Sequence, residues 1–252
     1  MSYPADGHAG CFQVEDGSFW FRHRNDCIAA MVKRNPPPPG AFLDIGGGNG
    51  YVAQRLQAEG LNVVLIEPGP TGAANAKRGR GLANVVCATI EDAQFEPASF
   101  AAIGMFDVIE HIEDDHAFLD SAVRLLPAGG MAYLTVPCHP WLWSRADIIS
   151  GHFRRHTRAS LRTLLSAHFD IAYLSYFFRP LPLPQLLLRS LPYRLGHQRG
   201  KGILPTETEH GTGHGLAANA LSRMLRGEVA NIAAGRVMHV GASALVAARK
   251  RA

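Results

Sequence analysis

A glycine-rich turn between an apolar segment and an amphipathic segment says more about the fold of this chain than any other feature. The turn belongs to the run FLDIGGGNGY, in which Gly46, Gly48 and Gly50 alternate with other residues. Glycine accepts positive φ and lets a ligand approach the backbone closely, and the first turn of a helix leaves N–H groups free to bind that ligand. The run therefore predicts a strand at 41–45, a ligand-binding turn and a helix at 51–59.

Short apolar runs alternate with amphipathic stretches along much of the remaining chain. Continuous apolar strands that alternate with helices are typical of a parallel α/β sheet covered on both faces. The further strand candidates are residues 62–66, 85–87, 101–106, 131–136, 169–178 and 237–248, and a second helix candidate is 114–126. The sequence therefore predicts an α/β fold.

Two segments fall outside this alternation. Residues 1–39 are predicted to form an N-terminal cap, with a loop, the aromatic cluster at 19–21, and a helix that ends before a run of four prolines. Residues 40–252 are predicted to form the α/β domain, with an inserted C-terminal segment at 179–236. That insert holds a proline-broken apolar piece, a loop rich in Gly and His, and a helix at 216–234. We interpret it as a lid over the functional edge of the sheet or as the interface of a homodimer, two uses that are compatible.

Composition excludes several classes of protein. The 252 residues are 47% hydrophobic and 18% charged, which excludes a disordered chain and allows a large core. No apolar run approaches the ~18 residues of a membrane span, and we expect no signal peptide because the first residues lack a basic start and an apolar core. The four cysteines lie far apart, which predicts free thiols and a cytoplasmic protein. The net charge of +4 does not demand a nucleic-acid partner.

Two carboxylates accompany the glycine turn. Asp44 lies two residues before Gly46, so the motif is D-x-G-x-G-x-G and differs from the G-x-G-x-x-G of nicotinamide-binding proteins. A carboxylate at the end of the first strand suits a ligand that bears a cationic amine. Glu67 ends the second apolar run, at about the expected interval of ~20 residues, where an acidic side chain can accept hydrogen bonds from both ribose hydroxyls.

These residues resemble those of the class I S-adenosylmethionine-dependent methyltransferases, over most of residues 40–178 and the last strand. That family has a Rossmann-like seven-stranded sheet with one antiparallel strand at the edge. The resemblance implies S-adenosylmethionine as the cofactor, with the glycine turn holding its methionine part and Glu67 holding its ribose. The cofactor-binding residues that it implies are Asp44, Gly46, Gly47, Gly48, Gly50, Glu67, Pro68, Ile90, Glu91, Phe106 and Asp107.

Ligands of open α/β sheets bind beyond the carboxyl ends of the strands, so the chemistry is expected in the loops after the fourth and fifth predicted strands. The segments WLWSRAD and GHFRRHT resemble a bacterial subgroup of the family with the pattern W-S…D…G-H-x-R-R-Y-T, with His156 in place of the Tyr. His152 is the candidate general base, because imidazole titrates near neutrality. The alternative is a histidine that caps the following helix or bonds a backbone carbonyl. The catalytic candidates are His152, Asp147 and His111.

A set of metal ligands is a further hypothesis. Asp107, Glu110, His111 and His152 resemble the E-x-x-E-H…H set of metal-dependent O-methyltransferases, including ubiquinone-pathway and small-RNA 2′-O enzymes, with Asp107 in place of the first Glu. Mixed carboxylate and imidazole ligands suit a divalent ion such as Mg²⁺ or Mn²⁺. The alternative is that Glu110 and His111 are held structurally, without a metal.

Basic and aromatic side chains are candidates for contact with the substrate. Arg154, Arg155, Arg158 and Arg162 form a cluster at helical spacing, and arginine binds carboxylate or phosphate well. The alternative is a solvated helix face. The substrate candidates are Trp20, Trp143, Arg154 and Arg155.

The sequence thus predicts a methyltransferase that acts on an oxygen, in preference to a nitrogen, of a small-molecule acceptor. One alternative is a metal-dependent RNA 2′-O-methyltransferase, against which the low net charge of +4 argues mildly. The other is a cofactor-binding scaffold without catalysis. The apolar part of the insert favours a partly lipophilic acceptor.

Overall fold

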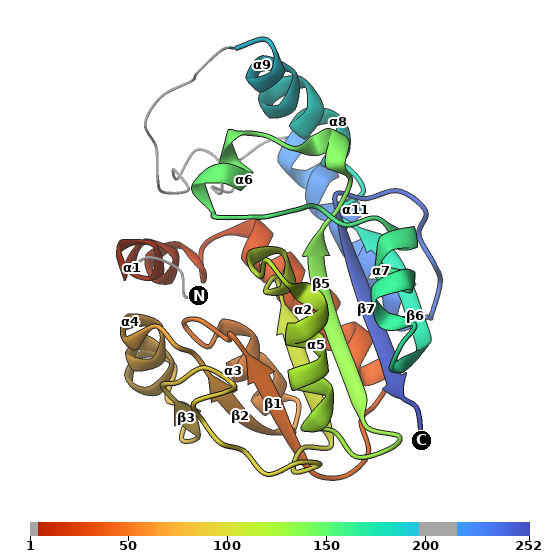
Figure 1. Cartoon of the computed structure of the whole chain (residues 1–252). Helices are drawn as coiled ribbons and strands as arrows, with labels where there is room; N and C mark the ends of the chain where they lie inside the picture. Colours follow the sequence, from red (N-terminus) through yellow and green to blue (C-terminus); the bar gives the residue numbers. More distant parts are fainter. Residues whose placement is uncertain (1–4, 197–215) are drawn as a thin grey trace.

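The computed structural model describes residues 5–196 and 216–252, and a seven-stranded sheet lies at its centre (Figure 1). The strands lie in the order β3-β2-β1-β4-β5-β7-β6. Every pair is parallel except the two pairs that β7 makes with β5 and β6. This sheet confirms the predicted α/β class, although the antiparallel strand lies one position in from the edge. The strands are β1 (Ala41–Ile45), β2 (Asn62–Ile66), β3 (Val85–Val86), β4 (Ala102–Phe106), β5 (Met131–Pro137), β6 (Phe169–Phe177) and β7 (Ser243–Lys250).

The last strand begins later than the predicted 237–248. Gly241 crosses so close to β6 that a Cβ on it would lie 2.2 Å from the carbonyl oxygen of Phe177. The pairing of β6 with β7 ends where Phe177 meets Ser243, so β6 offers no further partner to the residues before Ser243. The apolar residues there form a loop in which Val240 is 58% exposed.

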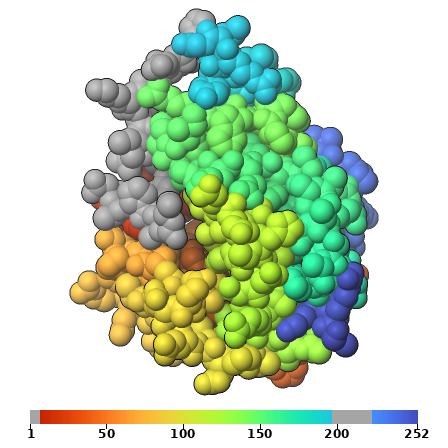
Figure 2. All heavy atoms as spheres, in the orientation of Figure 1, coloured from red at the N-terminus to blue at the C-terminus, as the bar shows by residue number. Residues whose placement is uncertain are grey.

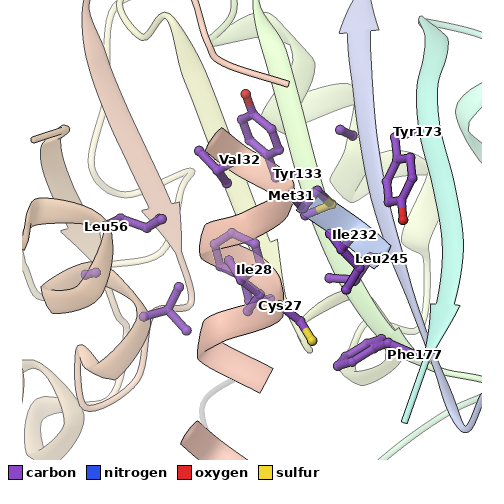
Figure 3. Close-up of a cluster of buried hydrophobic side chains, with 14 of the residues drawn as sticks. Cys27, Ile28, Met31, Val32, Leu56, Tyr133, Tyr173, Phe177, Ile232 and Leu245 are labelled. Carbon is purple, nitrogen blue, oxygen red and sulfur yellow. The ribbon is translucent and has the colours of Figure 1, made fainter. Parts of the chain in front are cut away.

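Helices cover both faces of the sheet. One face carries α2 (Phe19–Arg34), α3 (Tyr51–Ala58) and α11 (Leu216–Ala233), and the other carries α5 (Asp115–Arg124) and α7 (Arg158–Leu165). Figure 3 shows side chains of α2, among them Ile28 and Met31, gathered with Ile232 of α11 and with strand residues in one buried cluster. Burial of this apolar surface is the main stabilising contribution to the fold.

Shorter helices occupy the loops. They are α1 (Ala5–Val14), α4 (Pro70–Ala74), η1 (Asn75–Gly79), η2 (Ile109–His111), η3 (Pro140–Leu142), α6 (Arg145–Ile149), α8 (Pro182–Gln185), η4 (Leu186–Ser190) and α9 (Leu191–Arg194). None of the helices described for this chain is both long enough and apolar enough to cross a membrane.

The N-terminal segment contains a helix where the sequence predicts a loop. Helix α1 packs against α4, and its Phe12 ring fills the space beside Gly79, where a Cβ would lie 2.4 Å from the ring. Ser18 caps α2 by accepting a hydrogen bond from the Trp20 backbone N–H at 3.2 Å, and α2 ends at Arg34 before the prolines, as predicted. Contacts with distant residues thus order a segment whose local sequence carries few helix signals.

The two described parts of the predicted lid, residues 179–236, lie in different places in the structure. Its helix α11 packs against α2. Both helices cover the same apolar face of the sheet. The part formed by α8, η4 and α9 lies against η3 and α6, beyond the carboxyl end of β5 (Figure 1). The loop rich in Gly and His, near residues 210–215, lies outside the described residues.

A buried carboxylate joins α2, α11 and the turn after β6. Glu228 accepts hydrogen bonds from the backbone N–H groups of Phe178 at 2.9 Å and Arg179 at 2.6 Å. It also lies 2.9 Å from Nε2 of His23, which in turn is 3.4 Å from the Cys27 sulfur. Phe178 has φ of +59°, which strains a residue with a side chain. Glu228 therefore holds a strained turn in place.

Candidate active site

The glycine turn has the backbone conformation that its sequence predicts. Gly46, Gly48 and Gly50 have φ of +65°, +54° and +81°, a region that favours glycine. The N–H groups of Gly46 and Gly47 donate to the carbonyl oxygen of Ile66, at 2.8 and 3.3 Å. The turn is therefore held against the end of β2 and leads directly into α3.

Asp44 lies beneath this turn with one oxygen uncompensated. The residue is 1% exposed, and its Oδ2 has no hydrogen-bond partner in the described part of the chain. A Cβ on Gly47 would lie 2.8 Å from that oxygen, so glycine leaves it uncovered. The pKa of Asp44 is raised to about 7, and burial is the main cause. The positive charge of Arg24 opposes this rise, and the negative charge of Glu67 adds to it. A buried carboxylate oxygen without a partner fits the cationic amine of S-adenosylmethionine.

Glu67 follows β2, as predicted, and links two loops. Its Oε2 accepts a hydrogen bond from the Gly48 N–H at 3.0 Å, and its Oε1 accepts one from the Gly69 N–H at 2.7 Å. The residue is 3% exposed. These bonds fix the carboxylate at the rim of the glycine turn, and its contact with a ribose stays a prediction.

A cavity of about 340 Å³ opens beside the turn. Gly46, Pro68, Ile90 and Glu91 line it, together with side chains of the loop after β4 and of α5. Its predominantly apolar lining suits a flat aromatic group such as an adenine. The structure thus brings four of the predicted cofactor-binding residues to one cavity.

Phe106 and Asp107, at the end of β4, do not line this cavity, and their contact with the cofactor stays a prediction. Phe106 does not line the cavity, because its ring faces Phe42 at 6.5 Å between centroids. Asp107 has φ of +57°, and its Oδ2 lies 2.6 Å from Nε of Arg24, while Thr135 donates to its Oδ1 at 2.8 Å. Its carboxylate is therefore already paired within the protein.

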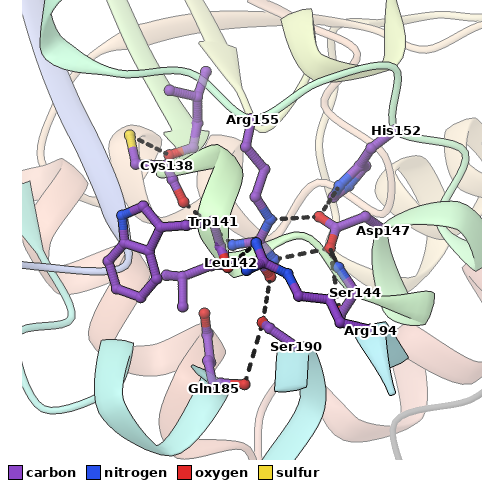
Figure 4. Close-up of polar contacts among 11 residues, drawn as sticks. Cys138, Trp141, Leu142, Ser144, Asp147, His152, Arg155, Gln185, Ser190 and Arg194 are labelled. Carbon is purple, nitrogen blue, oxygen red and sulfur yellow. Dashed lines mark hydrogen bonds and ion pairs between the residues drawn. The ribbon is translucent and has the colours of Figure 1, made fainter. Parts of the chain in front are cut away.

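The structure brings two of the catalytic candidates, His152 and Asp147, into contact. Nδ1 of His152 lies 2.9 Å from Oδ1 of Asp147 (Figure 4). Ser144 and Asp147 form a capping box that starts α6, and Arg155 contacts both carboxylate oxygens at 2.7 and 3.1 Å. Burial raises the pKa of Asp147, but the hydrogen bonds from His152 and Arg155 lower it to about 2. Asp147 therefore stays ionised and orients the imidazole.

Three of the four candidate metal ligands lie together. One ligand atom each of Glu110, His111 and His152 lies within 4.8 Å of the others, and the two imidazole rings are 4.7 Å apart between centroids. Glu110 is 1% exposed, and its Oε2 has no hydrogen-bond partner among the described residues. Burial raises the pKa of Glu110 well above its usual range. Asp107 is outside this group because Arg24 and Thr135 hold it.

The predicted substrate arginines contact acidic and backbone groups of the protein. Helix α7 begins at Arg158, so Arg154 and Arg155 lie in a loop and the expected helical spacing is wrong for them. Nη1 of Arg154 lies 2.6 Å from Oδ2 of Asp115, and its Nη2 donates to the carbonyl of Glu113. Both arginines therefore hold loops together, and a role for them in binding substrate stays a prediction.

The two predicted substrate tryptophans differ in their surroundings. Trp20 stacks on Phe178 at 5.4 Å between ring centroids, and the guanidinium of Arg24 lies 5.6 Å from the centroid of the Trp20 ring. Trp143 is half-buried between η3 and α6. Trp20 therefore packs against the turn after β6, whereas Trp143 directly precedes Ser144, the residue that caps α6 with Asp147.

Sequence reasoning missed three residues that shape the site. Arg24 donates to the carbonyl oxygen of Phe106 at 2.9 Å. Nε2 of His8 lies 3.7 Å from Oε1 of Glu67, and Asn49 donates to the carbonyl oxygen of His8 at 3.0 Å. Asn49 lies within the glycine run and could have been noticed there. His8 and Arg24 carry no local signal, because the fold brings them to the site from the N-terminal cap.

Comparisons with known proteins agree with this geometry. A family model described as a methyltransferase domain matches residues 20–191. A ubiquinone biosynthesis O-methyltransferase from Xylella fastidiosa is 31% identical over 111 residues, which are 42% of this chain and 45% of the relative. The relative of the same name from Nitrobacter winogradskyi is 28% identical over 116 residues, 44% of each chain. The matches therefore span less than half the length of these curated relatives.

Solved structures show the same fold. A SAM-dependent methyltransferase from Archaeoglobus fulgidus has a TM-score of 0.56 at 14% identity, over 90% of this chain and 94% of that one. The phosphoethanolamine N-methyltransferase 2 of Haemonchus contortus has a TM-score of 0.57 at 21% identity, over 90% of this chain and 53% of that one. With the matched domain, the glycine turn and the seven-stranded sheet, the chain belongs to the class I S-adenosylmethionine-dependent methyltransferases.

Proposed function

We propose that this enzyme transfers the methyl group of S-adenosylmethionine to a hydroxyl oxygen of a small molecule. The observation that carries the proposal is the His152–Asp147 pair in the loop after β5. The names of the relatives, O-methyltransferases of ubiquinone biosynthesis, support oxygen as the acceptor atom. The apolar side chains exposed on α8, η4 and α9 support an acceptor that is partly lipophilic.

His152 has the arrangement of a general base. With the proton on Nδ1 donated to Asp147, Nε2 carries the lone pair that can accept the proton of a hydroxyl group. The bound cofactor supplies a methyl group activated on a sulfonium. The hydroxyl oxygen bonds to that carbon, the electrons of the broken C–S bond go to sulfur, and the proton goes to Nε2 of His152. Asp147 fixes the tautomer and stabilises the imidazolium that results.

Replacing His152 with glutamine is expected to lower turnover by about 10²–10⁴-fold, the usual contribution of a general base. The affinity for S-adenosylhomocysteine should stay within about twofold of the unmodified protein, because His152 lies outside the cavity beside the glycine turn. The assay measures S-adenosylhomocysteine formed with a panel of alkyl-substituted catechols and primary amines.

His116→Gln is the matched control, because His116 is exposed on α5. Unchanged turnover in His152→Gln would contradict the proposed base. Transfer to the amines alone would contradict oxygen as the acceptor atom. No transfer to any acceptor of the panel, or to RNA added as a further acceptor, by a protein that binds the cofactor would favour the scaffold alternative.

A divalent metal is the second candidate feature of this reaction. The group Glu110, His111 and His152 and the buried unpartnered Oε2 of Glu110 fit an ion with oxygen and nitrogen ligands. Bound there, Mg²⁺ or Mn²⁺ would polarise the acceptor hydroxyl, and Glu110, His111 and His152 would hold the ion. The metal would then replace His152 as the activating group, because the free nitrogen of His152 would bind the ion and could not accept a proton.

Replacing Glu110 with glutamine is expected to weaken Mn²⁺ binding by at least about tenfold, because a charged ligand becomes neutral. Calorimetric titration with Mn²⁺ and Mg²⁺ measures this without any acceptor. Glu113→Gln is the control, since Glu113 is exposed in the same loop. If the unmodified protein bound neither ion and its turnover survived removal of divalent ions, the metal hypothesis would be wrong.

A further inference from the structure

The insert exposes a line of leucines on one side of a continuous helical segment. Elements α8, η4 and α9 follow one another from Pro182 to Arg194, and the spacing of the exposed leucines, by four, one, three and four residues, places them on one face. This leucine face consists of Leu183 (63% exposed), Leu187 (52%), Leu188 (64%), Leu191 (37%) and Leu195 (72%).

The helical segment is fixed to the protein by residues outside the leucine face. Ser190 is buried and donates to the carbonyl oxygen of Leu142 at 2.8 Å, and Arg194 donates to that of Trp141 at 2.9 Å (Figure 4). Leu186 packs against the core. The leucines therefore point away from the molecule because the backbone is anchored, and the face is part of the folded structure. Figure 2 shows this segment protruding at one end of the molecule.

Apolar side chains of the neighbouring loop enlarge this surface. Elements η3 and α6 contact η4, and the loop after β5 exposes Trp141 (42%), Ile148 (53%), Ile149 (37%) and Phe153 (42%). Single exposed apolar residues are common, whereas a gathering of this kind marks an interaction surface. Tryptophan and phenylalanine in such a surface are typical of contact with the interfacial region of a bilayer.

The positive charge of this helical segment indicates which kind of partner the leucine face binds. Residues 171–206 contain no Asp or Glu, so the charged side chains in and beside the helical segment, which include Arg179, Arg189 and Arg194, are all cations. A second copy of the chain, docked through the same face by a two-fold axis, would bring two segments of like positive charge together without an acidic partner in either. An anionic lipid surface would instead pair with the cations while the leucines enter the boundary between headgroups and acyl chains.

We propose that the leucine face docks this enzyme onto the surface of a membrane that contains anionic phospholipids. The docked orientation turns the loops after β4 and β5, which carry Glu110, His111, Asp147 and His152, toward the bilayer side of the molecule. A lipophilic acceptor would reach the site from the membrane without crossing water. The proposal goes beyond the proposed function and does not depend on it, because lipid binding needs no methyl transfer.

Sedimentation with vesicles tests the proposal on the full chain. We expect the protein to bind vesicles of phosphatidylglycerol mixed with phosphatidylcholine, to bind pure phosphatidylcholine at least tenfold more weakly, and to dissociate as salt is raised. The double variant Leu187→Gln and Leu188→Gln should bind the anionic vesicles at least tenfold more weakly. Val237→Gln with Val240→Gln removes two exposed apolar side chains outside the insert helices and should bind as the unmodified protein does.

Three further measurements separate the outcomes. Thermal unfolding and S-adenosylhomocysteine affinity should be unchanged in the leucine variant, because both side chains are exposed, and light scattering reports the oligomeric state. Absence of binding to anionic vesicles, or equal binding by the leucine variant, would overturn the proposal. So would a dimer that the leucine substitutions dissociate, since the face would then be an interface between copies.

Discussion

The variant Asp44→Asn is expected to bind S-adenosylhomocysteine about 100-fold more weakly than the unmodified protein, because a buried charged partner of the ligand amine is lost. The same substitution should make the cofactor-free protein more stable at pH 8. Both effects have one cause: Asp44 is buried with Oδ2 unpartnered among the described residues, so its charge is costly until a cation arrives.

The stability effect depends on pH in a defined direction. The pKa of Asp44 is raised by burial from 3.8 to about 7, so the folded state binds more protons than the unfolded state between these values. The contribution of Asp44 is therefore fully present below pH 4 and is lost as pH rises to about 7. At pH 8 the ionised group costs up to about 4 kcal/mol, which Asp44→Asn removes, less the cost of burying an amide.

Calorimetric titration with S-adenosylhomocysteine and urea unfolding at pH 5 and pH 8 test the two effects. Asp170→Asn is the control, since the Asp170 side chain is 72% exposed in its pair with Arg251. The stability gain of Asp44→Asn should be larger at pH 8 than at pH 5. Undiminished affinity would show that Asp44 does not bind the cofactor, whereas a loss of stability at pH 8 would show that its charge is compensated in the free protein.

The variant Glu228→Ala is expected to lower the free energy of unfolding by about 3–5 kcal/mol, as the removal of one partner from a buried polar cluster does. Three groups lose their acceptor at once: the backbone N–H groups of Phe178 and Arg179, and the imidazole of His23. The φ of +59° at Phe178 adds strain that the carboxylate no longer offsets.

Urea unfolding followed by circular dichroism measures the loss. Glu59→Ala is the matched control, because its pair with Arg55 is on the surface and its removal should change the free energy of unfolding by at most about 1 kcal/mol. If Glu228→Ala unfolded at nearly the same urea concentration as the control, the cluster would contribute little and α11 would be held by its apolar contacts alone.

The central strands could be predicted from sequence because each is a short apolar run with clear boundaries. The predicted ranges 41–45 and 62–66 equal β1 and β2, since glycine turns and a buried acidic residue mark their ends. The start of β7 could not be predicted, because Val237 and Val240 are β-branched residues typical of a strand. The close approach of Gly241 to the end of β6 excludes them from β7, and the local sequence does not show that approach.

The site could be predicted where its residues are neighbours in sequence. His152 and Asp147 lie five residues apart in a segment that the sequence singles out, although their hydrogen bond is known only from the structure. The partners of Asp107 and Arg154 could not be predicted, because Arg24 and Asp115 reach them from other parts of the chain. The sequence shows a candidate ligand or a free cation at such positions, while the fold supplies an ion pair.

Strand order has a consequence for the synthesis of this protein. Strand β7 lies between β5 and β6, so β6 has no neighbour in the sheet until residues 243–250 have left the ribosome. Until then two strand edges face water, and both can pair with other chains. The emergence of β7 joins segments more than a hundred positions apart, such as Met131 and Arg249, and contacts of such long range form slowly. The growing chain therefore has its greatest need of a chaperone in the interval before β7 emerges.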